Sequence, residues 1–198
     1  MSNESRQGNE VFGANQAQKA GFQTRNVMKD DFGYEVPVES VPLPSNGIIY
    51  EQETGLYGKE TLDIKSMTAK EEDILTSRAL IKKGTVITEL IKSCLTDKTI
   101  DVDSMISGDR NAVMTALRIT GYGSDYKVQV DCPECGAANK QTFMLDELPI
   151  KRLEINPIVE GSNLFEFILP VTKKKIQFKF LTGRDEVEMN TIAERKKK

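Results

Sequence analysis

The sequence predicts an α+β fold, in which a small helical unit packs beside a β-hairpin-rich unit. Two observations indicate this class. Apolar residues recur with a helical period between residues 68 and 120. After residue 123, short stretches alternate apolar and polar residues with period 2, which is typical of strands. We therefore predict a first unit over residues 36–123 and a second over 124–198, which contains a zinc-ribbon-like knuckle hairpin and a C-terminal helix.

Residues 1–35 precede both units and show neither period. They are rich in Asn, Gln, Gly and Ser, which predicts a disordered or partner-ordered arm. A plain flexible tail and a docking arm explain this composition equally well. Large apolar residues are the candidate docking residues of the arm: Phe12, Phe22, Val27, Met28 and Phe32.

An extended segment follows the arm, because the prolines at positions 37, 42 and 44 favour an extended backbone before them. Ser45-Asn46-Gly47 is typical of a turn. Residues 48–50 and residues 61–67 are then predicted as short strands.

Helices are predicted between residues 68 and 120. Thr68 and Glu71 form a capping box that starts the first helix, and Gly84 ends it. The second helix covers about 85–95 and has one apolar stripe, made of Ile87, Leu90, Ile91 and Cys94. The third runs from about 109 to 120 and ends at Gly121 and Gly123. The acidic residues of this region are interpreted as loop and cap residues rather than a metal cluster: Asp101, Asp103 and Asp109.

Hairpins and a last helix are predicted after residue 123. The stretches "YKVQV" and "KQTFML" flank a tight turn, and residues 164–170 and 175–181 alternate with period 2 around a short polar link. The final helix starts near residues 183–185 and runs into the charged C-terminal residues.

The turn of the first predicted hairpin reads Cys-Pro-Glu-Cys-Gly. Two cysteines separated by two residues can direct both sulfurs at one zinc ion. The small Gly136 lets the turn fold back so that backbone N–H groups donate to the thiolates. Cys132 and Cys135 are therefore candidate zinc ligands, and zinc is the candidate cofactor. A turn that binds no metal and a disulfide between these two thiols are the alternatives.

A closed structural zinc site takes four ligands, and the sequence offers few others. It contains three cysteines and no histidine. Cys94 is the further candidate, but its place on an apolar stripe favours a buried core thiol. Asp131 or Glu134, a second subunit, or a segment outside this chain could supply the rest. A redox Cys-x-x-Cys is disfavoured, because a strand rather than a helix follows the turn.

Composition and motifs argue against several classes of function. The chain of 198 residues has a net charge of −3, unlike a general nucleic-acid binder. It has no apolar run near the roughly 18 residues of a membrane span and no secretory signal at its start, so we expect a cytosolic protein with reduced thiols. Without histidine, no Ser-His-Asp or Cys-His arrangement can form, and no catalytic or cofactor-binding residues are predicted. The alternative function is a zinc-ribbon nucleic-acid-binding protein, but only Lys127 and Lys140 on the hairpin would oppose its acidic residues: Asp125, Asp131 and Glu134.

Several segments together resemble a known family: "VPLPSNGIIY", "MTAKEEDIL", "GDRNAVMTALRITGYGSDYKVQVDCPECG" and "FILPVTKKKIQFKFLTGRDE". In this order they are similar to the baseplate hub protein family of contractile-tailed, T-even-like bacteriophages. The resemblance covers roughly residues 37–195 and is most specific over 108–136. Cys132, Cys135 and Gly136 match the family's cysteine motif.

The resemblance implies a non-enzymatic baseplate hub subunit or tail assembly factor. Such a protein would contact other phage baseplate or tail hub proteins, and it could also form a homo-oligomer. It would be found in the host cytoplasm during assembly and in the tail baseplate of the virion. Exposed strand edges and the arm are the expected contact surfaces. Family members carry a second Cys-x-x-Cys nearer their C-terminus, so the resemblance places the partner of the knuckle beyond Lys198 or on a neighbouring molecule.

Overall fold

An antiparallel sheet in the order β1-β2-β3 forms one layer of the fold in the computed structural model, which describes residues 24–29 and 33–196. Its strands are β1 (Thr24–Lys29), β2 (Glu35–Pro42) and β3 (Thr61–Lys65). Val36 and Val38 alternate with exposed residues on β2, and Leu62 and Ile64 do so on β3. This alternation gives β2 and β3 each a buried face, because successive side chains of a strand point to opposite sides.

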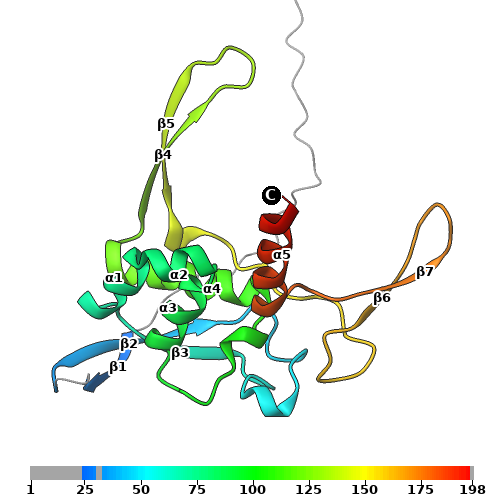
Figure 1. Ribbon diagram of the computed structural model, residues 1–198, viewed down its shortest axis with the longest axis horizontal. Helices are drawn as coiled ribbons and strands as arrows, with labels where there is room; N and C mark the ends of the chain where they lie inside the picture. The colour runs from blue at the N-terminus through cyan, green and yellow to red at the C-terminus, as the bar shows by residue number, and fades with distance from the viewer. Residues whose placement is uncertain (1–23, 30–32, 197–198) are drawn as a thin grey trace, which may run out of the picture.

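Helices lie on one side of this sheet (Figure 1). They are α1 (Ala69–Thr76), α2 (Arg78–Lys83), α3 (Val86–Cys94) and α4 (Ser107–Tyr122). The predicted stripe of α3 turns inward, with Leu90, Ile91 and Cys94 buried. Short 3₁₀ turns lie in the connections: η2 (Gln52–Thr54), η3 (Val102–Ser104) and η4 (Leu145–Glu147). Sheet and helices together confirm the predicted α+β class.

A hydrophobic core fills the space between the sheet and helices α3 and α4. Buried aliphatic side chains from strands, helices and loops build it, among them Leu43, Ile49, Leu62, Ile64, Leu90, Ile91, Val113 and Leu117. Complete burial of one such side chain contributes about 1.5–3 kcal/mol. Phe165 is 1% exposed and belongs to the same cluster, so the core includes side chains from both predicted units.

Hairpins extend away from this core in different directions (Figure 1). The first consists of β4 (Asp125–Asp131) and β5 (Ala138–Met144), and the second of β6 (Phe165–Ile168) and β7 (Lys175–Phe178). Helix α5 (Gly183–Lys196) follows and packs against η3. Both predicted hairpins and the predicted final helix are confirmed.

The helix predicted to run from residue 68 to 84 is interrupted. Ser77 has an extended backbone (φ −66°, ψ 105°), ends α1 and precedes α2. Serine is disfavoured inside helices and favoured at their starts, because its hydroxyl competes for backbone groups. The predicted ends hold: Thr68 and Glu71 form the capping box, and Gly84 ends α2 in the left-handed conformation.

The predicted strand at residues 48–50 is wrong, because this stretch forms turns. Ile48 donates its N–H to the carbonyl of Ser45, and Gly47 adopts a left-handed φ of 72°. The predicted lack of regular structure in the arm is wrong at residues 24–29, since β1 pairs with β2. Val27 and Met28 lie on that strand, whereas Phe12, Phe22 and Phe32 fall outside the described residues.

Candidate functional site

The β4–β5 hairpin is a projecting ribbon with two chemically different faces. The register pairs Tyr126 with Phe143 and Val130 with Asn139. Directly opposed residues share a face of an antiparallel pair, so one face carries the apolar and aromatic side chains of Tyr126, Val128, Val130 and Phe143 beside the amides of Asn139 and Gln141. Val130 is 53% exposed and Phe143 is 48% exposed. The ribbon therefore presents an apolar face to solvent.

The opposite face of this ribbon is polar and balanced in charge. By the same register it carries Asp125, Lys127, Asp131 and Lys140, two acids and two bases. A face that binds nucleic acid needs an excess of Lys and Arg to displace counterions. No observation on this hairpin therefore favours the alternative of a zinc-ribbon nucleic-acid-binding protein.

The turn at the tip of this ribbon has the folded-back shape that the sequence predicts. The Gly136 N–H donates to the Cys132 carbonyl over 2.8 Å, and the Cys132 N–H donates to the Ala137 carbonyl over 2.9 Å. Gly136 has a φ of 70°, a left-handed conformation that glycine adopts without strain. Backbone N–H groups of Cys135 and Glu134 donate to the Cys132 sulfur, and they lower the pKa of its thiol. The turn thus favours a thiolate at Cys132.

The structure does not bring Cys94 to this turn. Cys94 lies on α3 inside the hydrophobic core with 0% exposure, whereas Cys135 is exposed at the hairpin tip. Burial raises the pKa of the Cys94 thiol to about 12, which disfavours the thiolate that a metal requires. All three thiols are free, so the structure lacks the alternative disulfide. Among the described residues, no group of three Cys, Asp or Glu side chains is arranged to hold a metal ion.

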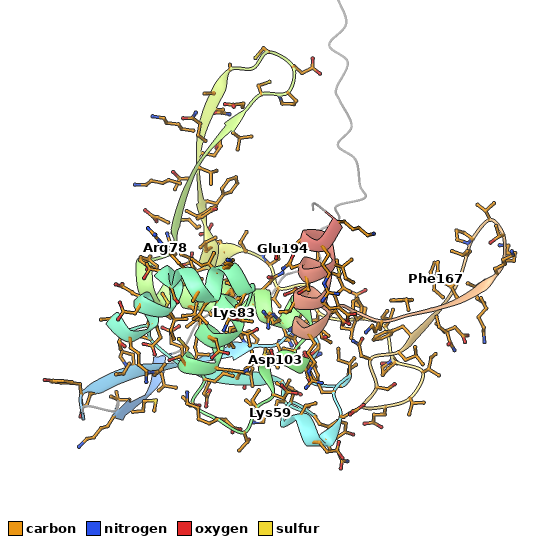
Figure 2. The ribbon with its side chains drawn as sticks, in the orientation of Figure 1. Lys59, Arg78, Lys83, Asp103, Phe167 and Glu194 are labelled. Atoms are coloured by element: carbon orange, nitrogen blue, oxygen red, sulfur yellow. The ribbon has the colours of Figure 1, made fainter. Side chains whose placement is uncertain are left out.

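The β6–β7 hairpin also carries an apolar face, and this face begins inside the core. Its register places Phe165, Phe167, Ile176 and Phe178 on one side. At the root, the Phe165 ring stacks on Phe178 at 5.5 Å and meets the edge of Phe180 at 5.0 Å. Farther out, Phe167 is 51% exposed and extends from the ribbon (Figure 2). The apolar surface is therefore continuous from the core to the exposed part of the hairpin.

A buried carboxylate that sequence reasoning interpreted as a cap organises the start of α4. Asp109 is completely buried and accepts hydrogen bonds from the Ser45 N–H (3.0 Å), the Ser45 hydroxyl (2.5 Å) and the Tyr50 hydroxyl (2.6 Å). The Tyr50 oxygen in turn accepts the Ile106 N–H over 3.1 Å. Burial raises the pKa of Asp109, and the bonds from Ser45 and Tyr50 oppose this rise. Asp109 therefore joins the 45–50 turn to α4 and does not cap its own helix.

A second buried carboxylate, Glu71, connects β3, α1 and α3. It accepts hydrogen bonds from the Thr68 N–H (2.9 Å) and hydroxyl (2.5 Å), and from the Ser93 hydroxyl (2.5 Å). The Lys65 ammonium lies 3.0 Å from Oε1 of Glu71. Burial would raise the pKa of Glu71, but the hydrogen bonds from Ser93, Thr68 and Lys65 lower it to about 2. The capping box seen in the sequence is thus one part of a tertiary network.

Comparison with protein families identifies the family of this chain. Residues 48–194, which include both hairpins and both buried carboxylates, match the model of a family described as T4 bacteriophage base plate protein. The chain belongs to this family. Comparisons with curated proteins and with solved structures returned no match.

Membership of the T4 bacteriophage base plate family confirms the resemblance at the level of the baseplate. The chain is a structural protein of the phage tail baseplate, where it contacts other baseplate proteins. No helix in the described ranges is long and apolar enough to cross a membrane. The matched range contains the exposed apolar faces of β4–β5 and β6–β7, which are the candidate contact surfaces.

Proposed function

We propose that this baseplate protein is a non-enzymatic hub subunit or tail assembly factor, which acts through contacts made by its β4–β5 and β6–β7 hairpins. The observation that carries the proposal is the exposed apolar face on each projecting hairpin. Contiguous exposed apolar surface marks interaction sites on soluble proteins. Aromatic side chains such as Tyr126, Phe143 and Phe167 are the kind that anchor protein–protein interfaces.

The edges of the hairpins add a second mode of contact. Among the described residues, each hairpin is a two-stranded sheet, so one edge of every strand lacks a strand partner. Such edges offer backbone N–H and C=O groups for strand addition. A partner that adds a strand to β4–β5 or β6–β7 would therefore gain both backbone hydrogen bonds and apolar contact.

The buried carboxylates support a non-enzymatic role. Strongly shifted pKa values often mark catalytic groups, but Glu71 and Asp109 are fully buried and hydrogen-bonded to core elements. Their shifts follow from their structural partners. The chain also has no histidine for acid–base chemistry at neutral pH.

The test compares substitutions on the two faces of the same hairpins. Val130→Asp and Phe167→Asp place a charge on the apolar faces, and Gln129→Asp and Gln177→Asp place the same charge on the opposite faces. A hot-spot side chain contributes about 2 kcal/mol or more, which corresponds to roughly 30-fold in affinity. Phage carrying either apolar-face variant should therefore assemble far fewer complete tails, counted by electron microscopy, than phage carrying the matched control.

Circular dichroism of the purified variants provides the folding control, because all four positions lie on exposed parts of the hairpins. Normal numbers of complete tails from folded Val130→Asp and Phe167→Asp proteins would contradict the proposal. An equal loss of complete tails from the variants of both faces would also contradict the proposal, because the apolar faces would then have no special role.

A further inference from the structure

A hollow of about 470 Å³, here called the lysine hollow, lies where β1, β3, α1 and α3 meet, at the opposite end of the fold from β6–β7 (Figure 1). Its volume falls within the range of natural ligand sites, roughly 300–1,000 Å³. Among the described residues that line it, Glu89 is the one acid. The basic lining residues are Lys29, Lys65, Lys70, Lys92 and Lys98. The hollow is therefore basic, although the chain as a whole has a net charge of −3.

Acidic side chains of the fold already pair with two of these lysines. The Lys65 ammonium lies 3.0 Å from Oε1 of the buried Glu71. The Lys92 ammonium lies 2.9 Å from Oδ2 of Asp103 and 3.8 Å from Oε1 of Glu89. These three carboxylates hold β3, α1, α3 and η3 together, so their charge is used within the fold.

Lys29 and Lys98 provide positive charge that no described acid neutralises. Glu35 lies opposite Lys29 in the register of β1 and β2, but the two side chains form no ion pair. The Lys98 ammonium donates to the carbonyls of Lys92 (2.8 Å) and Ser93 (3.0 Å), which fix it at the end of α3. An ammonium has three N–H groups, so one donor of Lys98 remains for a ligand.

The surroundings of Lys98 favour the arrival of an anion. Burial and the charges of Lys65 and Lys70 lower the pKa of Lys98. Like charges repel each other most where water screens them least, and a carboxylate within hydrogen-bonding distance of Lys98 would offset that repulsion. Because the fold holds these ammonium groups together in advance, an anion binds at a lower entropic cost.

The other lining residues indicate which kind of molecule carries the anion. Met28, Ile74 and Leu95 add apolar surface to the lysine hollow, which suits a ligand with both apolar and acidic groups. Proteins commonly bind phosphate with arginine forks or with the backbone N–H groups of a helix N-terminus. The described lining contains no arginine, and the helix end beside it is the C-terminal end of α3. Side-chain carboxylates that alternate with apolar side chains therefore fit the hollow better than phosphate groups do.

We propose that the lysine hollow binds an acidic segment of another baseplate protein, whose carboxylates pair with Lys29 and Lys98 and whose apolar side chains contact the apolar lining. The chain is a baseplate protein that contacts other baseplate proteins, so a protein segment is the ligand that it meets. Complementary charge of this kind directs the choice of partner and the rate of association. The contact is separate from β4–β5 and β6–β7 and gives the chain a further docking surface.

Fluorescence polarisation of the full-length protein with labelled peptides measures this binding. The probe is a fluorescein-labelled peptide of alternating glutamate and leucine, and its control has glutamine in place of every glutamate. The glutamate peptide should bind at least about tenfold more tightly than the glutamine peptide, as expected for hydrogen bonds between charged groups. Inorganic phosphate added as a competitor should displace the probe less effectively than the same concentration of unlabelled glutamate peptide.

Glutamine variants of individual lysines locate the contact. Lys29→Gln and Lys98→Gln should each weaken binding of the glutamate peptide at least about tenfold. The controls Lys140→Gln and Lys174→Gln remove the same charge from exposed positions on the two hairpins and should leave the affinity unchanged, because distant surface charges are screened at physiological salt. Lys29 is exposed on β1, so Lys29→Gln still tests the hollow if loss of the Lys98 contacts to α3 lowers the melting temperature.

Three outcomes would overturn the proposal. Equal affinity for the glutamate and glutamine peptides would show that charge does not direct the binding. Unchanged affinity of both Lys29→Gln and Lys98→Gln would place the binding site elsewhere on the chain. Displacement of the probe by phosphate as effective as that by the glutamate peptide would identify a phosphate site instead.

A further variant tests whether the chain supplies the carboxylates itself. Asp30 and Asp31 directly follow Lys29 in the sequence. Replacement of both by asparagine should leave the affinity for the probe unchanged, and a gain of about tenfold would show that these acids compete for the lysines and that no partner is required. Val130→Asp and Phe167→Asp should bind the probe as the wild type does, so failure of this proposal can be distinguished from failure of the hub assignment.

Discussion

Replacement of Glu71 by glutamine tests whether this buried carboxylate stabilises the fold as an anion. The hydrogen bonds from Ser93, Thr68 and Lys65 lower the pKa of Glu71 from its ordinary value of 4.5 to about 2 in the folded protein. Each pH unit of displacement corresponds to about 1.4 kcal/mol, so the ionised form contributes about 3 kcal/mol to the free energy of unfolding at neutral pH. The variant keeps the size of the side chain but leaves the Lys65 ammonium, which is nearly buried, without its counter-charge.

The stability that Glu71→Gln loses relative to the wild type should depend on pH. A folded-state pKa below the unfolded value stabilises the protein above about pH 4.5, and this contribution disappears as the pH falls towards 2. The melting temperature of Glu71→Gln at pH 7 should therefore be lower by about 6–12 °C, at roughly 2–4 °C per kcal/mol for a chain of this size. Between pH 4.5 and 2 the two proteins should converge, because wild-type Glu71 becomes protonated and resembles glutamine.

The neighbouring residue supplies a matched control. Glu72 lies one position later on α1, is exposed, and Glu72→Gln should change the melting temperature by less than about 2 °C. Differential scanning calorimetry at several pH values measures all three proteins. A Glu71→Gln variant as stable as the wild type at pH 7 would refute the reasoning. A difference that stays constant down to pH 2 would refute it as well, because protonation would then have no part in the loss.

Two further predictions concern the turn at residues 45–50. Tyr50→Phe removes the hydroxyl between Asp109 and the Ile106 N–H and should lower the free energy of unfolding in urea by about 1–3 kcal/mol. The control Tyr57→Phe, at an exposed site, should lower it by less than about 0.5 kcal/mol. Equal losses in the two variants would contradict a special role for the buried network. Gly47→Ala would place a Cβ 2.4 Å from the backbone nitrogen of Lys59, at a φ of 72°. It should lower the free energy of unfolding clearly more than the control Gly58→Ala, whose Cβ would meet open space and for which strain of about 1 kcal/mol is expected. A smaller loss for Gly47→Ala than for Gly58→Ala would show that the turn relaxes freely.

Local sequence signals predicted the elements whose cause is local. The capping box at Thr68, the glycine stop at Gly84 and the alternating hairpin strands all depend on residues close in sequence. The partners of Asp109 could not be found this way, because Ser45 lies 64 positions earlier and Tyr50 lies 59 positions earlier. Their approach to Asp109 is a result of the tertiary fold.

The features of the candidate site also differ in whether local sequence or tertiary packing determines them. The Cys-x-x-Cys spacing and Gly136 predicted a folded-back turn, because three or four adjacent residues decide its shape. The position of Cys94 in the core agrees with its apolar stripe, which is a local pattern as well. The apolar face of β6–β7 was harder to anticipate, because the sequence shows alternation but not which face the core leaves uncovered. Only the packing of Phe165 against Phe178 and Phe180 separates the buried root from the exposed end.

The arrangement of the core allows stability and contact to be altered separately. The buried carboxylates join the turn at 45–50, β3 and helices α1, α3 and α4, and none of them lies on a hairpin. The exposed faces of β4–β5 and the outer part of β6–β7 add little to the core, so charges placed there should leave unfolding unchanged. Phe165 is the exception, because it belongs to the core and to the root of β6–β7 at once. The core therefore fixes the direction of that hairpin, and a partner that binds its outer face meets a surface whose orientation is set before binding. Such preorganisation lowers the entropic cost of binding a partner.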